Sequence, residues 1–118
     1  MTIETIDAAI LAHHSWVARF QTSLKGINTE SFDIGKARDD SACVLGQWLQ
    51  SERSRDLLGA DAHALIMVIH ATFHEIAGNI AEKLNQHESS SDIAAWLVEF
   101  NNLSSQLVML LMHTKKKF

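Results

Sequence analysis

Four side chains of this sequence could together bind one metal ion. His70 and His74 lie four positions apart, so on an α-helix both imidazoles project from the same side. His13 and Cys43, the only cysteine of the chain, add a third imidazole and a thiolate. Three imidazoles and one thiolate form a tetrahedral donor set suited to zinc. Because all four donors are protein atoms, no position remains open for the water of a catalytic zinc ion, and the set predicts a sensing protein rather than an enzyme.

Each of these residues also has a purely structural explanation. A single inward histidine is more often a hydrogen-bonded core residue than a ligand, and a lone cysteine is usually a small buried hydrophobic residue. Two buried histidines on one helix face would need two separate polar partners, however, and donors on other helices favour a shared metal further. His14 is the main rival of His13 for the first ligand, although it projects about 100° away on a helix.

The surroundings of Cys43 also bear on its chemistry. Cys43 falls in the first turn of a predicted helix, where the helix dipole and free amides favour the thiolate. Gly46 is costly inside a helix, and we interpret it as a position where another backbone approaches closely. Trp48, like Trp16 and Trp96, is expected to pack in the core rather than to form a recognition surface.

The composition is typical of one globular domain. Of the 118 residues, 47% are hydrophobic and 20% are charged, and we expect a single domain over residues 1–118. The chain contains no proline, which allows long uninterrupted helices. The net charge of −4 without a basic stripe gives little support for nucleic-acid binding. The lysines at 115–117 are expected to form the solvated end of a last helix, where they offset its dipole.

The cellular location of the protein can be predicted from three features that the sequence lacks. The longest apolar stretch, residues 64–70, is too short to span a bilayer, so no membrane insertion is expected. The N-terminus carries Glu4 and Asp7 but no basic segment, so it does not resemble a signal peptide. One cysteine cannot form an internal disulfide. A cytoplasmic, reducing location is therefore predicted, and there the thiol is free to bind metal.

Four amphipathic segments predict an all-α fold, an antiparallel four-helix bundle with a shorter second helix. The first helix stops at Gly26, and residues 27–38 read as a connection. The second helix begins near residues 39–41 and ends around Arg55. The third runs from residues 59–61 to about Gln86, and a polar turn at 87–92 leads into the fourth. The predicted inward positions step by three and four. They include Ile6, Ile10, His13, Val17, Phe20 and Leu24 in the first helix, Met67, His70, His74, Ala77, Ala81 and Leu84 in the third, and Ile93, Trp96, Phe100, Leu103, Leu107 and Leu110 in the fourth.

Three motifs of the chain resemble a known family, the chemoreceptor zinc-binding (CZB) domains of bacteria. These domains show His-x-x-Trp in the first helix, then Cys-x-(aromatic or aliphatic)-Gly-x-Trp-(hydrophobic), and later His-x-x-x-His. The matching segments here are 13–16, 43–49 and 70–74, in the same order and spacing, and the resemblance covers nearly the whole chain. It implies that zinc is held by His13, Cys43, His70 and His74, and it selects His13 over His14.

The resemblance also implies a regulatory role. Oxidation of Cys43 by hypochlorous acid or a similar oxidant would remove a thiolate ligand and perturb the zinc site. Family members usually carry the domain beside a receptor signalling region or a diguanylate cyclase domain, and this chain has room for neither. It therefore resembles a stand-alone module, or one cut from a longer protein, with a homodimer or an unknown signalling protein as partner. The chain has Asp40 where the family often has a histidine.

Two alternatives remain from the sequence alone. A hemerythrin-like bundle that binds non-haem iron would need bridging carboxylates, and Glu75 and Glu82 lie on the third helix without a matching set elsewhere. A metal-free helical interaction module would satisfy its histidines within the core. The metal content of the purified protein separates these alternatives from the zinc module.

Overall fold

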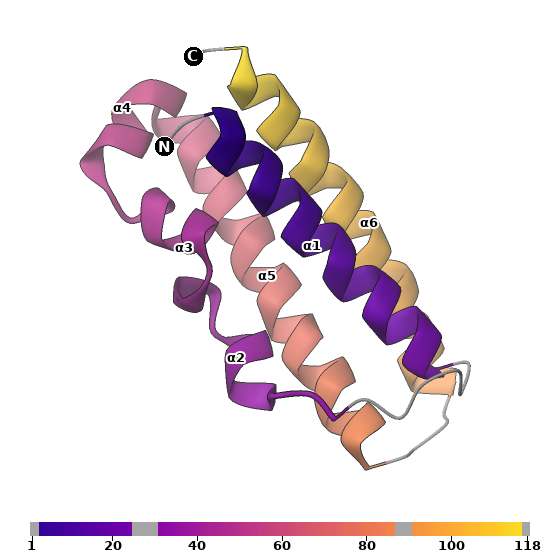
Figure 1. The fold of residues 1–118 in the computed structure, drawn as a ribbon. Helices are drawn as coiled ribbons and strands as arrows, with labels where there is room; N and C mark the ends of the chain where they lie inside the picture. The colour runs from indigo at the N-terminus through magenta and orange to yellow at the C-terminus, as the bar shows by residue number, and fades with distance from the viewer. Residues whose placement is uncertain (1–2, 25–30, 87–90, 117–118) are drawn as a thin grey trace.

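Three long helices run the length of the molecule (Figure 1). They are α1 (Ile3–Leu24), α5 (Ala60–Asn85) and α6 (Ser91–Lys115), and α6 runs antiparallel to the other two. The described residues contain no strand, so the predicted all-α class is confirmed. The structure is a computed structural model that describes residues 3–24, 31–86 and 91–116.

Between α1 and α5 the chain returns as four short elements in place of one shorter helix. They are α2 (Ile34–Arg38), the 3-10 turn η1 (Asp40–Ala42), α3 (Val44–Leu49) and α4 (Glu52–Leu58). The predicted connection over residues 27–38 thus contains a helix, and the predicted second helix is broken into three. Just before each of these four elements, a side chain accepts a hydrogen bond from a backbone amide two or three residues later. Such a cap favours the beginning of a new helix over the continuation of the previous one. These capping residues are Asp33, Asp39, Cys43 and Ser51.

The boundary between α4 and α5 depends on one glycine. Gly59 has a φ of 86°, which a residue with a side chain rarely adopts, and its amide donates to the carbonyl of Arg55 to close α4. The start of α5 at Ala60 agrees with the start predicted near residues 59–61. The predicted stop at Gly26 lies outside the described residues.

The core consists of two clusters of buried side chains, one toward each end of the bundle. In the aromatic cluster, Phe73 stacks on Phe100 with ring centroids 4.2 Å apart. Leu103, which is half-buried, packs against both clusters. The aromatic cluster contains Val17, Phe20, Phe32, Ala37, Phe73, Ile76, Ala77, Ile80, Ala81, Leu84, Ile93 and Phe100. The aliphatic cluster contains Ile6, Ala9, Leu45, Leu49, Leu58, Ile66, Ile69, Leu107 and Leu111.

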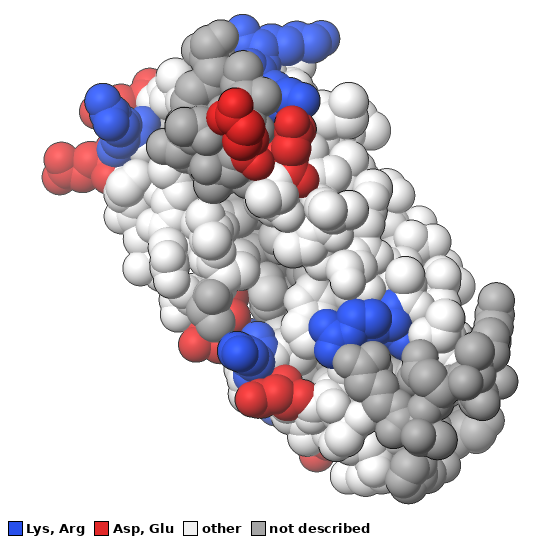
Figure 2. Space-filling model, viewed as in Figure 1, with Lys and Arg blue, Asp and Glu red and all other residues white. Residues whose placement is uncertain are grey.

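The helix α5 carries much of both clusters. By length and composition it could cross a membrane, but half of its most apolar stretch is buried inside the bundle, as in the core helix of a folded domain. Most of its predicted inward positions are buried, whereas Met67 is 37% exposed. Ile66 and Ile69 fill the aliphatic cluster beside it. On the face seen in Figure 2, charged side chains gather at the upper end and in a band below the middle, and the surface between these two groups is largely uncharged.

Candidate metal centre

All four predicted ligands meet between the aromatic and the aliphatic clusters. His13 comes from α1, His70 and His74 from α5, and Cys43 from the residue that caps α3. One donor atom from each of the four lies within 4.8 Å of all the others. The Nε2 of His70 is 3.1 Å from the Sγ of Cys43 and 3.0 Å from the Nε2 of His74. Residues from three separate parts of the chain therefore present two kinds of donor to one point.

The distances are close to those of a tetrahedral zinc site. Zn–N and Zn–S bonds of ordinary length place two nitrogen ligands about 3.4 Å apart and a nitrogen and a sulfur about 3.6 Å apart. The two observed separations are somewhat shorter than these values, and every other pair of donor atoms lies within 4.8 Å. In the described part of the chain, this is the one group of three or more His, Cys, Asp or Glu residues arranged closely enough to share a metal.

Hydrogen bonds to the backbone orient two of the imidazoles. The Nδ1 of His13 donates to the carbonyl of Ala9, and the Nδ1 of His74 donates to the carbonyl of Ala37 at 2.9 Å. A carbonyl oxygen only accepts, so in each neutral ring the proton sits on Nδ1 and the Nε2 lone pair faces the centre. The Nε2 of His13 is buried without any hydrogen-bond partner. A buried nitrogen in that state is costly unless something fills the centre.

Burial keeps the histidines in the form that binds metal. The side chains of His13, His70 and His74 are 3%, 1% and 2% exposed. Burial lowers the pKa of His13 from 6.5 to about 4 and that of His70 to about 3. It also lowers the pKa of His74, although the Ala37 carbonyl partly opposes this shift. All three imidazoles are therefore neutral at pH 7.

The thiol of Cys43 behaves differently from the sequence prediction. Burial raises its pKa, and the amides of Gly46 and Leu45 offset this effect only in part. The pKa is raised because Cys43 caps a helix of only six residues and lies beside the buried residues Leu45 and Gly46. The short helix does not favour the thiolate enough, so a bound cation is needed to stabilise it.

Gly46 lies at a close approach of two backbone segments, as predicted from the sequence. A Cβ at this position would lie 1.7 Å from the carbonyl oxygen of Asp40 and 3.2 Å from the Cε1 of His70. The missing side chain thus lets η1 fold back against α3 and leaves room for the imidazole. The thiol of Cys43 donates to the same Asp40 carbonyl at 3.5 Å.

Two further residues that support the centre were not identified from the sequence. A Cβ on Gly78 would lie 2.6–2.7 Å from the Nε and Cβ of Arg38, so this glycine lets α2 lie close against α5. Arg38 then donates to the side chain of Asn79 at 3.0 Å and pairs with Glu82 at 3.5 Å. This docking brings the Ala37 carbonyl to His74. The available signal in the sequence was a glycine one helical turn after His74, inside a predicted helix, where glycine is costly.

The remaining histidines lie away from the four donors. His14 and His113 are exposed, and His87 lies outside the described residues. His63 is half-buried, and its Nε2 donates to the Leu49 carbonyl at 2.6 Å. The two tryptophans of the predicted motifs, Trp16 and Trp48, are partly buried against the aromatic and the aliphatic cluster.

The centre lies inside the segment that matches a known family. A family model described as the chemoreceptor zinc-binding domain matches residues 13–81, which contain all four donors and the four short elements. Comparisons with curated proteins and with solved structures found no match.

Proposed function

This chain belongs to the chemoreceptor zinc-binding domain family, and we propose that it is a cytoplasmic regulatory module whose zinc ion is held by His13, Cys43, His70 and His74. One observation carries the proposal. Four donors from three parts of the chain converge between the two core clusters, and the Nε2 of His13 has no other partner there. The chemistry of the set, three neutral imidazoles and one thiol, is the one that zinc prefers.

The positions of the donors connect zinc binding to the shape of the bundle. His13 fixes one face of α1, His70 and His74 fix the middle of α5, and Cys43 fixes the junction of η1 and α3. A bound zinc ion supplies the positive charge that keeps Cys43 as a thiolate. Because the donors belong to separate elements, their joint occupancy favours one placement of α1 and α3 on α5. Four protein donors also argue against catalysis.

Cys43 gives the module a redox response. It is the only cysteine of the chain, and its side chain is partly exposed. Hypochlorous acid or a similar oxidant converts it first to a sulfenic acid, which is no longer a thiolate donor. Oxidation therefore weakens the site at the junction of η1 and α3, and this junction relays the signal to a partner.

The proposed partners are a second copy of the chain and a signalling protein. Large apolar side chains are exposed on all three long helices, and such side chains favour contact with another protein surface. These residues are Leu11, Leu65, Met67, Val68, Val98, Met109 and Met112. Light scattering on the purified protein measures the oligomeric state.

The test is the metal content of protein purified without chelator. We expect one zinc ion per chain in the wild type and loss of zinc in Cys43→Ser and in His13→Ala. His14→Ala is the matched control, because His14 is the adjacent histidine and is exposed. Iron in the wild type would favour the hemerythrin-like alternative, and no metal would favour the interaction module. Unchanged zinc affinity in Cys43→Ala would defeat the ligand assignment.

The same proteins test the redox role. Hypochlorite treatment of the wild type should release zinc, and oligomeric state is measured before and after treatment. Retention of zinc after complete oxidation of Cys43 would contradict the proposed response while leaving the zinc site itself in place.

A further inference from the structure

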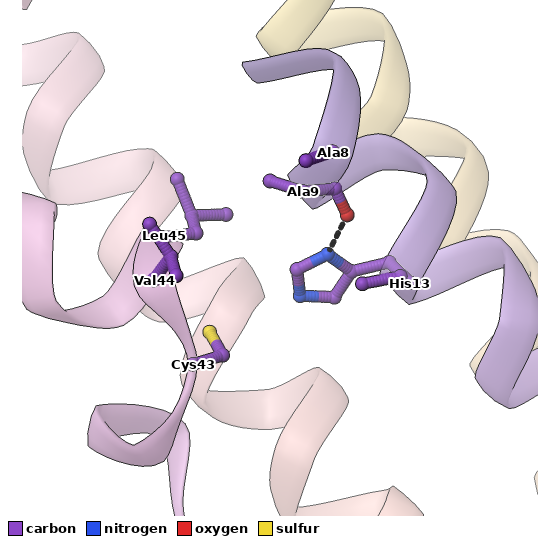
Figure 3. Close-up of a pocket in the computed structure, with 7 residues that line it drawn as sticks. Ala8, Ala9, His13, Cys43, Val44 and Leu45 are labelled. Carbon is purple, nitrogen blue, oxygen red and sulfur yellow. Dashed lines mark hydrogen bonds between the residues drawn. The ribbon is translucent and has the colours of Figure 1, made fainter. Parts of the chain in front are cut away.

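A cavity opens beside the four donors, between α1 and the start of α3 (Figure 3). Its volume is about 250 Å³, enough for a molecule of several heavy atoms. Figure 3 shows His13 of α1 on one side of the cavity and Cys43, at the start of α3, on the other. The other residues that line the cavity are Ala8, Ala9, Ala12, Val44 and Leu45.

The walls of this cavity are apolar except at its inner end. Three alanines on one side of α1 leave the space open, because larger side chains there would fill it. His13, whose Nε2 has no hydrogen-bond partner, also lines the cavity. Its side chain is only 3% exposed. In Figure 2 the surface along the middle of the groove between α1 and α3 is mainly uncharged, with Lys, Arg, Asp and Glu gathered above and below it.

We propose that this cavity is the entrance through which small uncharged oxidants reach the Sγ of Cys43, and that it disfavours anions of the same size. The proposal rests on the proposed redox function of Cys43. An anion that enters loses part of its hydration, and the aliphatic walls offer no donor in exchange. An uncharged molecule such as hypochlorous acid loses far less. The cavity thereby selects the class of oxidant, and its size rejects large disulfides.

The reaction at the inner end is a two-electron oxidation. The thiolate sulfur of Cys43 attacks the chlorine of hypochlorous acid, so an S–Cl bond forms, the Cl–O bond breaks and hydroxide leaves. Water then displaces chloride from sulfur, giving the sulfenic acid, chloride and a proton. Sulfur has lost two electrons, and the chlorine has gained them as chloride.

Two alkylating reagents of nearly equal size test the charge selectivity. Iodoacetamide is uncharged and iodoacetate is an anion, and both react with the same thiolate, so the ratio of their rates does not depend on the pKa of the thiol. The chain has one cysteine, so every thiol signal reports Cys43. The same protein unfolded in denaturant gives the intrinsic ratio. We expect the native ratio of iodoacetamide to iodoacetate to exceed the unfolded ratio about tenfold or more.

This measurement is made on zinc-loaded protein and on chelator-treated protein. Equal ratios in the native and unfolded states would overturn the charge selectivity. Failure of both reagents to alkylate either native form would overturn the entrance itself, because the cavity would then not lead to the sulfur.

A plugged cavity tests the route. Ala12→Met places a long side chain at the cavity, and Ala18→Met, an exposed alanine of the same helix outside the cavity, is the matched control. We expect Ala12→Met to slow both iodoacetamide alkylation and hypochlorite-driven zinc release about tenfold, and Ala18→Met to leave both rates unchanged. Ala8→Met serves as a second plug if Ala12→Met fails to fold.

Zinc content separates the two proposals. If the wild type binds no zinc, the zinc-binding function fails, whereas the alkylation ratio still decides the entrance. If zinc is bound and the plugged variants react at the wild-type rate, the entrance is wrong and the zinc-binding function stands.

Discussion

The long helices and the segmented stretch between α1 and α5 build the centre in different ways. The helix α5 buries eleven residues between Ile66 and Leu84, and His70 and His74 lie among them. The short helices α2, α3 and α4 each bury between one and three residues. They are joined by caps and by two contacts that only glycine permits, at Gly46 and Gly78.

This difference predicts which part of the centre is stable by itself and which part depends on a bound ion. The histidines are fixed by packing that the metal does not provide, since both core clusters hold α5. Cys43, in contrast, is held by the hydrogen bonds with which it caps α3. Without a bound cation its thiol stays protonated, because burial raises its pKa. The segmented stretch should therefore respond most to metal and to oxidation, and the long helices least.

Metal removal should reveal this contrast most strongly. At a free zinc concentration 1,000 times its dissociation constant, binding adds about 4 kcal/mol to the free energy of unfolding, and a chelator removes it. We expect amide hydrogen exchange to accelerate mainly in residues 40–49, with little change in α6. Uniform acceleration over the whole chain would show that the two regions are not distinct.

Gly46→Ala should disrupt mainly the segmented stretch between α1 and α5. Its Cβ would collide with the backbone of Asp40, so η1 or α3 must move. We expect a loss of about 3 kcal/mol in unfolding free energy and most of the zinc affinity, measured by urea unfolding and zinc titration. Gly35→Ala is the control, because its Cβ would meet only the Asp33 side chain at an ordinary 3.6 Å. Equal effects of the two substitutions would contradict this account.

Acid should destabilise the chelated protein through the histidines of the long helices. The folded pKa values of His13 and His70 are about 4 and about 3, below the unfolded value of 6.5, so the unfolded chain binds more protons between these limits. Stability is full above pH 6.5 and falls by up to about 1.4 kcal/mol per pH unit for each histidine as the pH is lowered. Urea unfolding from pH 7.5 to 5.0 measures the slope. His14→Gln should leave it unchanged, whereas His70→Gln should reduce it.

Gly78→Ala should have the smallest effect and act where the two regions meet. The new methyl group pushes Arg38 away and loosens α2, and the Ala37 carbonyl then holds His74 less firmly. We expect a loss of about 1 kcal/mol and a roughly tenfold lower zinc affinity. In an Arg38→Gly background the same change should be neutral or stabilising. If it remains destabilising there, the contact with Arg38 is not the cause.

The same contrast explains what could be predicted from the sequence. The spacing of His70 and His74 and the stripes of α1 and α5 depend on helical periodicity, which a sequence displays directly. The break-up of residues 31–58 depends on capping by Asp33, Asp39 and Ser51, and such residues occur in many helices without ending them. The raised pKa of Cys43 depends on burial by neighbours distant in sequence. The support of His74 by Ala37 could not be predicted, because it uses a backbone carbonyl.

The position of the four donors between two separate apolar clusters has a consequence for engineering. Three buried imidazoles and a thiol occupy a layer that leucine or phenylalanine would fill in an ordinary bundle. Replacing that layer with apolar residues of similar volume would join the two clusters into one continuous core. Such a protein should be more stable than the chelated wild type, indifferent to zinc and to oxidant, and fixed in one state. The layer of the four donors is thus expected to be the least stable part of the chelated protein, as is common where stability and function compete.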